Sequence, residues 1–108
     1  MAWTVETLDD VVDAELDELP ADMQASFVYI SRLIEEFGLE RVRQPHVKHV
    51  LGALWEMRLK GRDGISRALY VTAVGRRVVV VRVFIKKTQK TPNREIELAL
   101  KRAKELRQ

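Results

Sequence analysis

The fold is decided by the stretch from Leu54 to Ile85, LWEMRLK-GRDG-ISRALYVTAV-GRR-VVVVRVFI. Apolar and charged residues alternate from Leu54 to Lys60, which is typical of a half-buried strand with one apolar and one charged face. The polar turn Gly61–Gly64 leads into a second strand from about Arg67 to Val74. After another turn, the valine-rich run Val78–Ile85 predicts a central strand buried on both faces. Three consecutive strands joined by tight turns predict an antiparallel meander.

The period of two also assigns side chains to the two faces of this sheet. We expect helices to cover the face that carries Trp55, Met57 and Leu59. The opposite face is expected to be partly open and basic, with Arg58, Lys60, Arg82 and Lys86 on it. In the last strand, one face is assigned Arg82, Phe84 and Lys86, and the other Val81, Val83, Ile85 and Lys87.

The residues before the meander predict a short strand and two helices. Trp3–Glu6 is the strand candidate, and Thr7 is expected to cap a helix that Pro20 ends. From about Ala21 to Phe37, apolar residues recur every three or four positions, as on one face of a helix, and Gly38 is a natural C-terminal stop. The short turn between the two helices predicts an antiparallel pair.

Two further segments complete the order of elements. Residues 39–53 contain Pro45 and Gly52 and are expected to form a loop with one short helical turn. At the other end, Thr91 is expected to cap a C-terminal helix with Pro92 at its first position. We therefore expect a single α+β domain over residues 1–108 in the order β-α-α-β-β-β-α. The two N-terminal helices should lie on one face of an antiparallel sheet.

Charge is divided unevenly along the chain. Residues 1–40 hold 11 acidic residues and one basic residue, whereas residues 41–108 hold 18 basic and 5 acidic residues. The net charge of +3 therefore combines −10 in the first part with +13 in the second. A basic region of this kind attracts polyanions such as nucleic acid, although acidic helices packed beside a basic sheet give the same totals.

Several classes of protein are excluded by what the sequence lacks. It has no cysteine, which excludes disulfide scaffolds, thiol catalysis and cysteine-bound metal centres. His46 and His49 are too few to hold zinc, so neither a metal nor a cofactor is expected. No apolar run approaches the roughly 20 residues that span a bilayer, and no secretory signal is visible. The expectation is a soluble cytoplasmic protein.

Three motifs in the second half of the chain carry a family resemblance. They are Leu54-Trp55-Glu56-Met57-Arg58, Ser66-Arg67-Ala68-Leu69-Tyr70, and the segment VFIKKTQKTP at Val83–Pro92, followed by the helix pattern E-I-x-x-A-x-x-R at Glu95–Arg102. Over residues 50–105 the chain resembles the RelE/ParE superfamily of toxins, specifically its HigB-like, phage-derived branch. The KKTQKTP stretch is the most specific of these signals.

This resemblance implies a small RelE-like fold and a toxin of a type II toxin–antitoxin system. Members of this branch are typically endoribonucleases (mRNA interferases) that cut mRNA on the translating ribosome, and their antitoxin is usually a helix-turn-helix DNA-binding protein. ParE relatives share the fold but poison DNA gyrase, so gyrase inhibition is one alternative, and a noncatalytic nucleic-acid-binding phage protein is another. Many relatives also carry a catalytic Tyr or His near the C-terminus. This chain has neither after Lys90, which leaves the general acid unassigned.

The residues themselves suit metal-independent RNA cleavage, in which the ribose 2′-hydroxyl is the nucleophile. The site must accept a proton, stabilise charge on the phosphate and protonate the leaving oxygen. A lysine crowded by cations has a lowered pKa, which makes Lys86 and Lys87, expected near Arg82 and Lys90, candidate bases. Arg58 and Arg67 suit bidentate phosphate binding, and Glu56 would act as a base or orient Arg58.

Further residues are assigned to RNA binding, each with a structural alternative. Lys60, Arg82 and Lys90 provide positive charge, and Phe84 and Tyr70 provide rings that stack on an unstacked base. Phe84 and Tyr70 are alternatively core residues, and Glu56 and Arg58 alternatively form a surface ion pair. The nuclease hypothesis requires that Arg58, Arg67 and Lys87 converge on one pocket.

Overall fold

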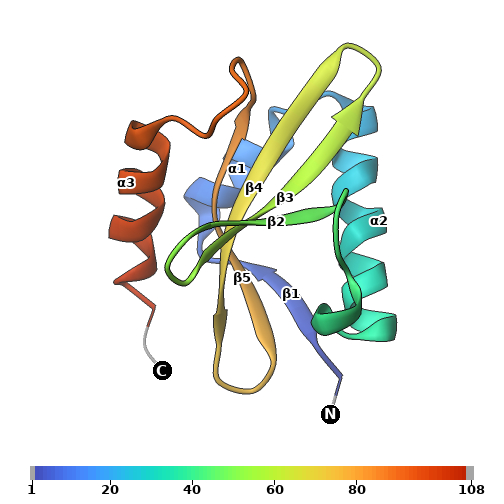
Figure 1. Ribbon diagram of the computed structural model, residues 1–108, viewed down its shortest axis with the longest axis vertical. Helices are drawn as coiled ribbons and strands as arrows, with labels where there is room; N and C mark the ends of the chain where they lie inside the picture. The colour runs from blue at the N-terminus through green and yellow to red at the C-terminus, as the bar shows by residue number, and fades with distance from the viewer. Residues whose placement is uncertain (1, 107–108) are drawn as a thin grey trace.

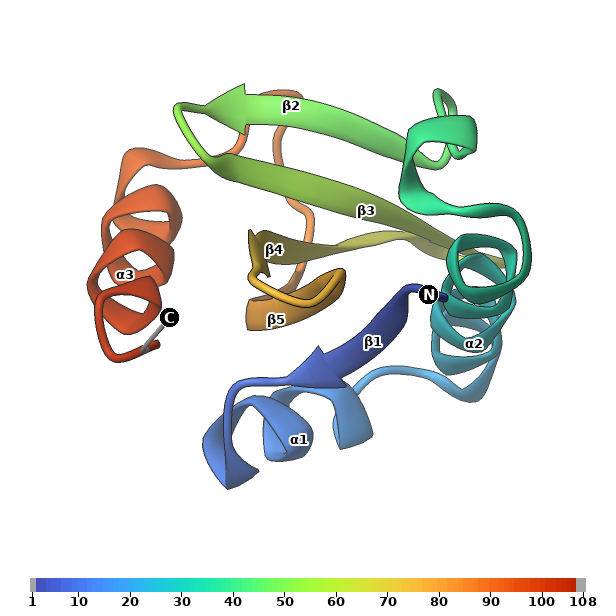
Figure 2. The ribbon, with the colours of Figure 1, turned by 90° about the horizontal axis from the view of Figure 1, so that it is seen from below.

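The computed structural model describes residues 2–106, which fold into a five-stranded sheet with helices on both of its faces (Figures 1 and 2). The elements are β1 (Thr4–Thr7), α1 (Asp10–Asp17), α2 (Ala21–Phe37), the 3-10 turn η1 (Leu39–Arg41), β2 (Val47–Leu51), β3 (Leu54–Gly61), β4 (Gly64–Ala73), β5 (Arg77–Ile85) and α3 (Asn93–Ala103). The strand order is β1-β5-β4-β3-β2, with β1 parallel to β5 and the other neighbours antiparallel. The α+β class is therefore confirmed, and the order of elements agrees with a small RelE-like fold.

The three central strands form the predicted meander. β3 pairs with β4 and β4 with β5, and the β3–β4 hairpin closes where Gly61 lies opposite Gly64. A Cβ atom on Gly61 would lie 2.7 Å from Met23 Cγ and 2.8 Å from Asp22 Oδ1, so only glycine fits there. The hairpin turn thus packs directly against the first turn of α2.

Strand β2 lies in the segment that was predicted to be a loop. It forms the edge of the sheet and pairs with β3, with Val47 opposite Met57 and His49 opposite Trp55. Five residues with a mixed polar pattern have little strand preference of their own, because strand stability depends on the neighbouring strand. The loop prediction for residues 39–53 was therefore wrong over β2, whereas the short helical turn is present as η1.

Helix α2 begins and ends as predicted, at Ala21 and Phe37, and Gly38 follows it with a φ of +92°. The start of α1 differs from the prediction. Thr7 still belongs to β1, and Asp9 caps the helix through a 3.1 Å hydrogen bond from the Val12 N–H to its Oδ1. α1 packs mainly on β5 and α2 mainly on β3, so the sheet holds both helices in place.

The C-terminal helix also begins differently from the prediction. α3 starts at Asn93, and Pro92 occupies the N-cap position without any side-chain capping bond. Thr91 does not cap this helix: it precedes the N-cap, and its hydroxyl oxygen accepts a hydrogen bond from Arg67 while donating to a carboxylate of β3. α3 packs on β5 and β4, on the opposite side of the sheet from α2 (Figure 2).

Buried side chains form one apolar cluster on each face of the sheet. The cluster under α1 and α2 includes Val12, Ile30, Ile34, Met57, Leu59, Tyr70 and Val83. The cluster under α3 includes Leu54, Leu69, Val79, Val81 and Ala99. Val81 and Val83 therefore lie on opposite faces, contrary to the prediction. The cause is a bulge in β5, where one extra residue shifts the alternation of side chains.

The helices were also compared with the requirements of a bilayer span. Within residues 2–106, no helix has both the length and the apolar character that crossing a membrane demands.

Candidate functional site

Two arginines face each other on the side of the sheet that α3 partly covers. Arg58 of β3 lies directly opposite Arg67 of β4, and Glu56 lies two residues before Arg58 on the same face. Two guanidinium groups in adjacent cross-strand positions repel each other, and a neighbouring carboxylate offsets this repulsion. The strand register thus brings three of the predicted catalytic residues together.

Glu56 and Arg67 form a buried ion pair that Thr91 completes. Arg67 Nε lies 3.3 Å from Glu56 Oε2, and the two residues are only 5% and 2% exposed. The Thr91 hydroxyl donates to Glu56 Oε1 at 2.7 Å and accepts a hydrogen bond from Arg67. Arg67 also donates to the Gln89 carbonyl at 2.6 Å. These bonds tie the segment that follows β5 to the floor of the sheet.

This arrangement changes the role expected of Glu56. The carboxylate pairs with Arg67 inside the protein, so the alternative of a surface ion pair with Arg58 was wrong. The Glu56 carboxylate contacts Arg67 and Thr91 rather than a ligand in solvent. Glu56 and Arg67 therefore hold β3, β4 and the segment after β5 together beneath the surface of the site.

Arg58 and Lys86 lie closer to solvent and are the cations available to a ligand. Both are half-buried, and within residues 2–106 neither forms a salt bridge with a carboxylate. Arg58 Nε is buried without a hydrogen-bond partner. Partial burial lowers the pKa of Lys86, and the charges of Arg67 and Arg58 lower it further, against the opposing effect of Glu56. Lys86 is therefore crowded by cations, but these are Arg67 and Arg58 rather than the predicted Arg82, which pairs with carboxylates instead.

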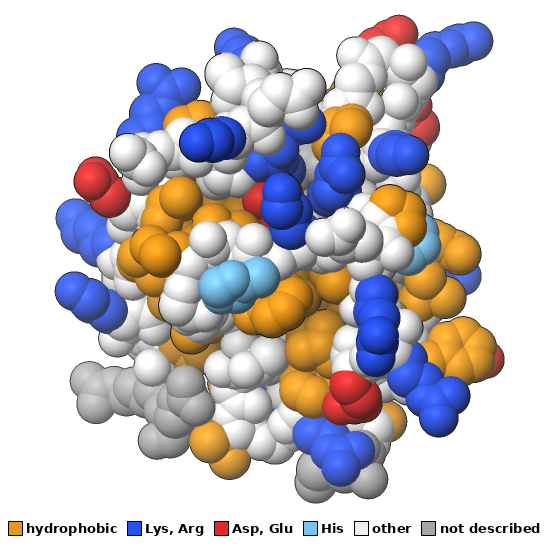
Figure 3. Space-filling view, viewed as in Figure 1, with side chains coloured by type: hydrophobic (Ala, Val, Ile, Leu, Met, Phe, Trp, Pro, Cys, Tyr) orange, Lys and Arg blue, Asp and Glu red, His pale blue; other side chains and the backbone are white. Residues whose placement is uncertain are grey.

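An open hollow of about 280 Å³ lies beside this cluster. Glu56, Arg67 and Thr91 line its floor, and Lys48 of β2 and Lys90 line its rim. Figure 3 shows Lys and Arg side chains gathered over the upper part of this face, around the region where β2, β3 and the segment after β5 meet. The hollow is thus positively charged at its mouth and holds its single carboxylate at the bottom.

The other predicted lysines lie in different places. Lys87 lines a separate hollow with Glu15, Glu18 and Arg82. Lys60 is exposed near the β3–β4 turn and lines a small hollow beside α2, together with Arg58. The expected convergence of Arg58, Arg67 and Lys87 on one pocket was therefore wrong, because Arg67, Arg58 and Lys87 line three different hollows although Arg58 and Arg67 are cross-strand neighbours.

Arg82 belongs to an ion-pair network that joins three elements. It lies 2.7 Å from Glu15 of α1 and 2.7 Å from Glu95 of α3, and Glu15 also pairs with Arg102 at 2.8 Å. Glu15 accepts a hydrogen bond from the Val83 N–H at 3.1 Å, at the part of β5 that extends beyond β1. The network covers this exposed strand edge. It also engages the Arg82 guanidinium, which was assigned to RNA binding from the sequence.

The two predicted stacking rings are also away from the hollow. Tyr70 is 1% exposed in the cluster under α1 and α2, and burial raises its pKa. Phe84 is half-buried against the α3-side cluster, with the Arg82 guanidinium 5.9 Å from its ring centroid. Both positions match the structural alternative given for these residues.

Sequence reasoning missed three contributors to this site. Lys48 was missed because it lies on β2, which has no clear strand pattern. Thr91 and the Gln89 carbonyl were missed because their contacts cross from one segment to another. The KKTQKTP motif, which contains both residues, was the available signal. Within residues 2–106, no group of three or more His, Asp or Glu side chains could hold a metal ion.

Comparison with known families agrees with this picture. No curated protein matches the sequence. The family model described as "Phage derived protein Gp49-like (DUF891)" matches residues 14–104, which include every residue of the cluster just described. The chain therefore belongs to the Gp49-like family of phage-derived proteins, a family of RelE/ParE-like toxins.

Proposed function

We propose that this protein is the toxin of a type II toxin–antitoxin system, of the HigB-like branch, and that it cleaves mRNA on the ribosome. Membership of a RelE/ParE-like family supports the toxin role. The observation that carries the nuclease role is the position of Lys86 beside Arg58 and Arg67, next to a hollow rimmed by Lys48 and Lys90. Cations around a concave surface favour a polyanionic substrate.

The reaction follows from the charges of the site. Lys86 in its deprotonated form accepts the proton of a ribose 2′-hydroxyl, and the 2′-oxygen attacks the adjacent phosphorus. Arg58 stabilises the negative charge that develops on the phosphate oxygens, since a guanidinium binds two of them at once. The bond from phosphorus to the 5′-oxygen breaks, and a protonated lysine at the rim, Lys48 or Lys90, gives that oxygen its proton. The products are a 2′,3′-cyclic phosphate and a 5′-hydroxyl.

Two adjacent lysines provide the test. Lys86→Ala removes the proposed base, whereas Lys87→Ala removes the same type of side chain from a separate hollow. In a purified translation system, we expect Lys86→Ala to slow mRNA cleavage by about 10²–10⁴-fold, the usual contribution of general acid–base catalysis. Lys87→Ala should cleave at the wild-type rate. Mapping of 5′ ends by sequencing gives the positions and amounts of the cuts.

Two results would reject the nuclease. One is intact mRNA with growth arrest and inhibited DNA supercoiling by purified gyrase, which is the behaviour of a ParE-like inhibitor. The other is equal loss of cleavage in the Lys86 and Lys87 variants, which would show that only net charge matters. RNA binding that weakens steeply with salt, without cleavage or toxicity, would indicate a noncatalytic binding protein.

The proposed partner is a helix-turn-helix antitoxin that neutralises the toxin in the cytoplasm. A basic hollow on the toxin favours an acidic segment on that partner. Co-expression of the adjacent reading frame should relieve growth arrest, and the two proteins should co-purify as a complex. Growth arrest that persists when a helix-turn-helix neighbour is co-expressed would contradict this part of the proposal.

A further inference from the structure

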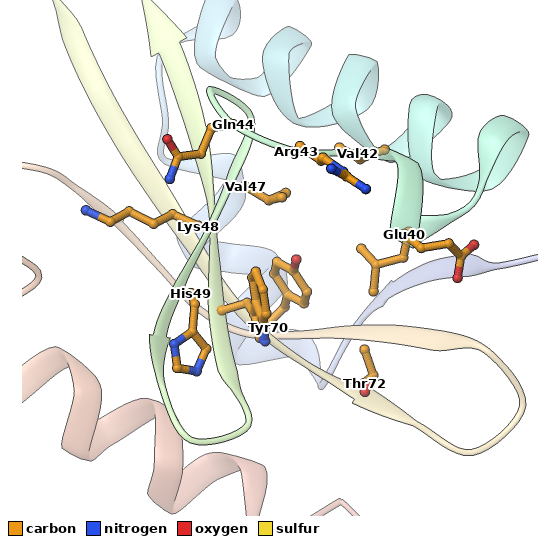
Figure 4. Close-up of a pocket in the computed structure, with 11 residues that line it drawn as sticks. Glu40, Val42, Arg43, Gln44, Val47, Lys48, His49, Tyr70 and Thr72 are labelled. Carbon is orange, nitrogen blue, oxygen red and sulfur yellow. The ribbon is translucent and has the colours of Figure 1, made fainter.

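A cavity of about 570 Å³ lies between η1, the segment that follows it and the sheet (Figure 4). Val42, Val47, Trp55 and Tyr70 contribute apolar and aromatic walls. Tyr70 and Trp55 lie on the sheet face under α1 and α2, so this cavity is on the other side of the sheet from the Glu56–Arg67 pair. A cavity of this size holds a small organic group rather than a few water molecules.

The cavity and the basic hollow meet at strand β2. Lys48 and His49 of β2 line both spaces, whereas β3 and β4 contribute different residues to each from opposite faces of the sheet. β2 is also the edge of the sheet, with β3 as its one partner strand within residues 2–106. A polymer bound at the basic hollow can therefore pass over this edge and reach the cavity without any rearrangement of the sheet.

An aromatic pair stands at the entrance. The His49 and Trp55 rings lie 5.0 Å apart between centroids at an interplanar angle of 66°, and His49 Nε2 is held 2.7 Å from the Gly52 carbonyl oxygen. Trp55 is 39% exposed although it occupies a strand between well-buried neighbours. An aromatic ring that is fixed in orientation and open on one side is a suitable stacking surface for a flat ligand.

Polar groups are placed at the rim of the cavity, where a base edge and a phosphate would need them. Gln44 supplies an amide that both donates and accepts hydrogen bonds, and Thr72 supplies a hydroxyl. Lys48 and Arg43 supply positive charge and Glu40 one negative charge, and Figure 4 shows these side chains at the margins rather than at the floor.

We propose that this cavity binds an unstacked nucleobase of the RNA strand whose backbone occupies the basic hollow. The inference rests on the proposed function, because it places a nucleotide that flanks the cleaved bond. Trp55 stacks on the base, Gln44 and Thr72 bind its edge, and Lys48 contacts the phosphate between the two spaces. The cavity would thus contribute to the choice of cleavage site.

Trp55 itself reports on binding. In a Trp3→Phe background it is the only tryptophan, and its emission can be excited at a wavelength where nucleobases do not absorb. We expect a short single-stranded RNA to quench this emission saturably, and ribose 5-phosphate, which has no base, to leave it unchanged. Thr72→Phe fills the cavity from an exposed position on β4. It should weaken RNA binding by about 5- to 150-fold, as the loss of one stacked base does.

The control for this variant is Val74→Phe, the same new side chain at an exposed position outside the cavity. It should bind RNA like the parent protein. Circular dichroism of each variant establishes that it is folded before binding is measured.

The outcomes separate this inference from the nuclease. If the parent protein cleaves mRNA but RNA does not quench Trp55, and Thr72→Phe cleaves at unchanged positions, the base site is refuted and the nuclease stands. If RNA quenches Trp55 and Thr72→Phe abolishes it, but no cleavage occurs, the base site stands and the nuclease is refuted. Quenching by an acidic peptide and not by RNA would make the cavity a protein-binding site and overturn the inference.

Discussion

Replacing Glu56 by Gln tests whether the buried Glu56–Arg67 pair holds the site together. The substitution keeps the size of the side chain and an acceptor for the Thr91 hydroxyl, but it removes the charge opposite Arg67. Both residues are at most 5% exposed, so the guanidinium would be left in the interior without a counterion. Removing one partner of a buried pair costs about 3–5 kcal/mol, and the retained Thr91 bond places this case near the lower value, about 3 kcal/mol.

This free energy corresponds to a large shift in the melting temperature. Unfolding entropy is about 2.1 cal/mol/K per residue, or about 0.23 kcal/mol/K for 108 residues. A loss of about 3 kcal/mol therefore lowers the melting temperature by about 13 °C. Urea denaturation followed by circular dichroism measures the free energy directly, because a small single domain usually unfolds in one step.

A double-mutant cycle with Arg67→Met isolates the interaction. Each single variant leaves one buried charge unpaired, whereas Glu56→Gln with Arg67→Met leaves none. We therefore expect the double variant to lose at least about 2 kcal/mol less than the sum of the two single losses. Single losses below about 1 kcal/mol that simply add would refute the view that this pair organises the site.

Three further predictions concern pH and packing. Burial raises the pKa of Glu15, but hydrogen bonds from Arg102, Val83 and Arg82 bring it below the ordinary value of 4.5. The stability that Glu15 provides is therefore complete above that pH and lost below it. Glu15→Gln should flatten the decline in unfolding free energy between about pH 6 and about pH 3. The charge of Arg58 contributes to the lowered pKa of Lys86, so Arg58→Met should raise that pKa and shift the rising part of the pH–rate profile for cleavage to higher pH. A profile whose rising part does not shift would exclude Lys86 as the base. Gly61→Ala should destabilise the fold by about 1–3 kcal/mol in thermal denaturation, since its Cβ would lie 2.7 Å from Met23 Cγ. Gly52→Ala is the control, because it has open space around it but a φ of +55°. It should lose only about 1 kcal/mol, the cost of placing alanine in that backbone conformation.

The structure brings only some of the predicted site residues together. Crowding by cations was expected at Lys86 and Lys87 from Arg82 and Lys90, whereas in the structure Arg58 and Arg67 lie near Lys86 and Arg82 pairs with carboxylates. The burial of Glu56 could not be predicted, because it depends on Thr91, which lies 35 residues further along the chain. Arg82 reads as an exposed cation in a strand, yet two carboxylates from different helices engage it.

The sequence alone determined the features that depend on residues close together along the chain. Period-two alternation gave the β3–β4–β5 meander, period-3.6 spacing gave α2 from Ala21 to Phe37, and Gly38 ended it. Tertiary structure alone decided the features that depend on contacts between residues far apart in the sequence. β2 is a strand only because β3 lies beside it, and the bulge at Val81 reverses the faces of β5. Thr91 caps no helix because its hydroxyl bonds to Arg67 and Glu56, which lie on neighbouring strands. Local patterns encode backbone conformation, whereas the partners of a charged side chain are chosen among residues that only folding brings within reach.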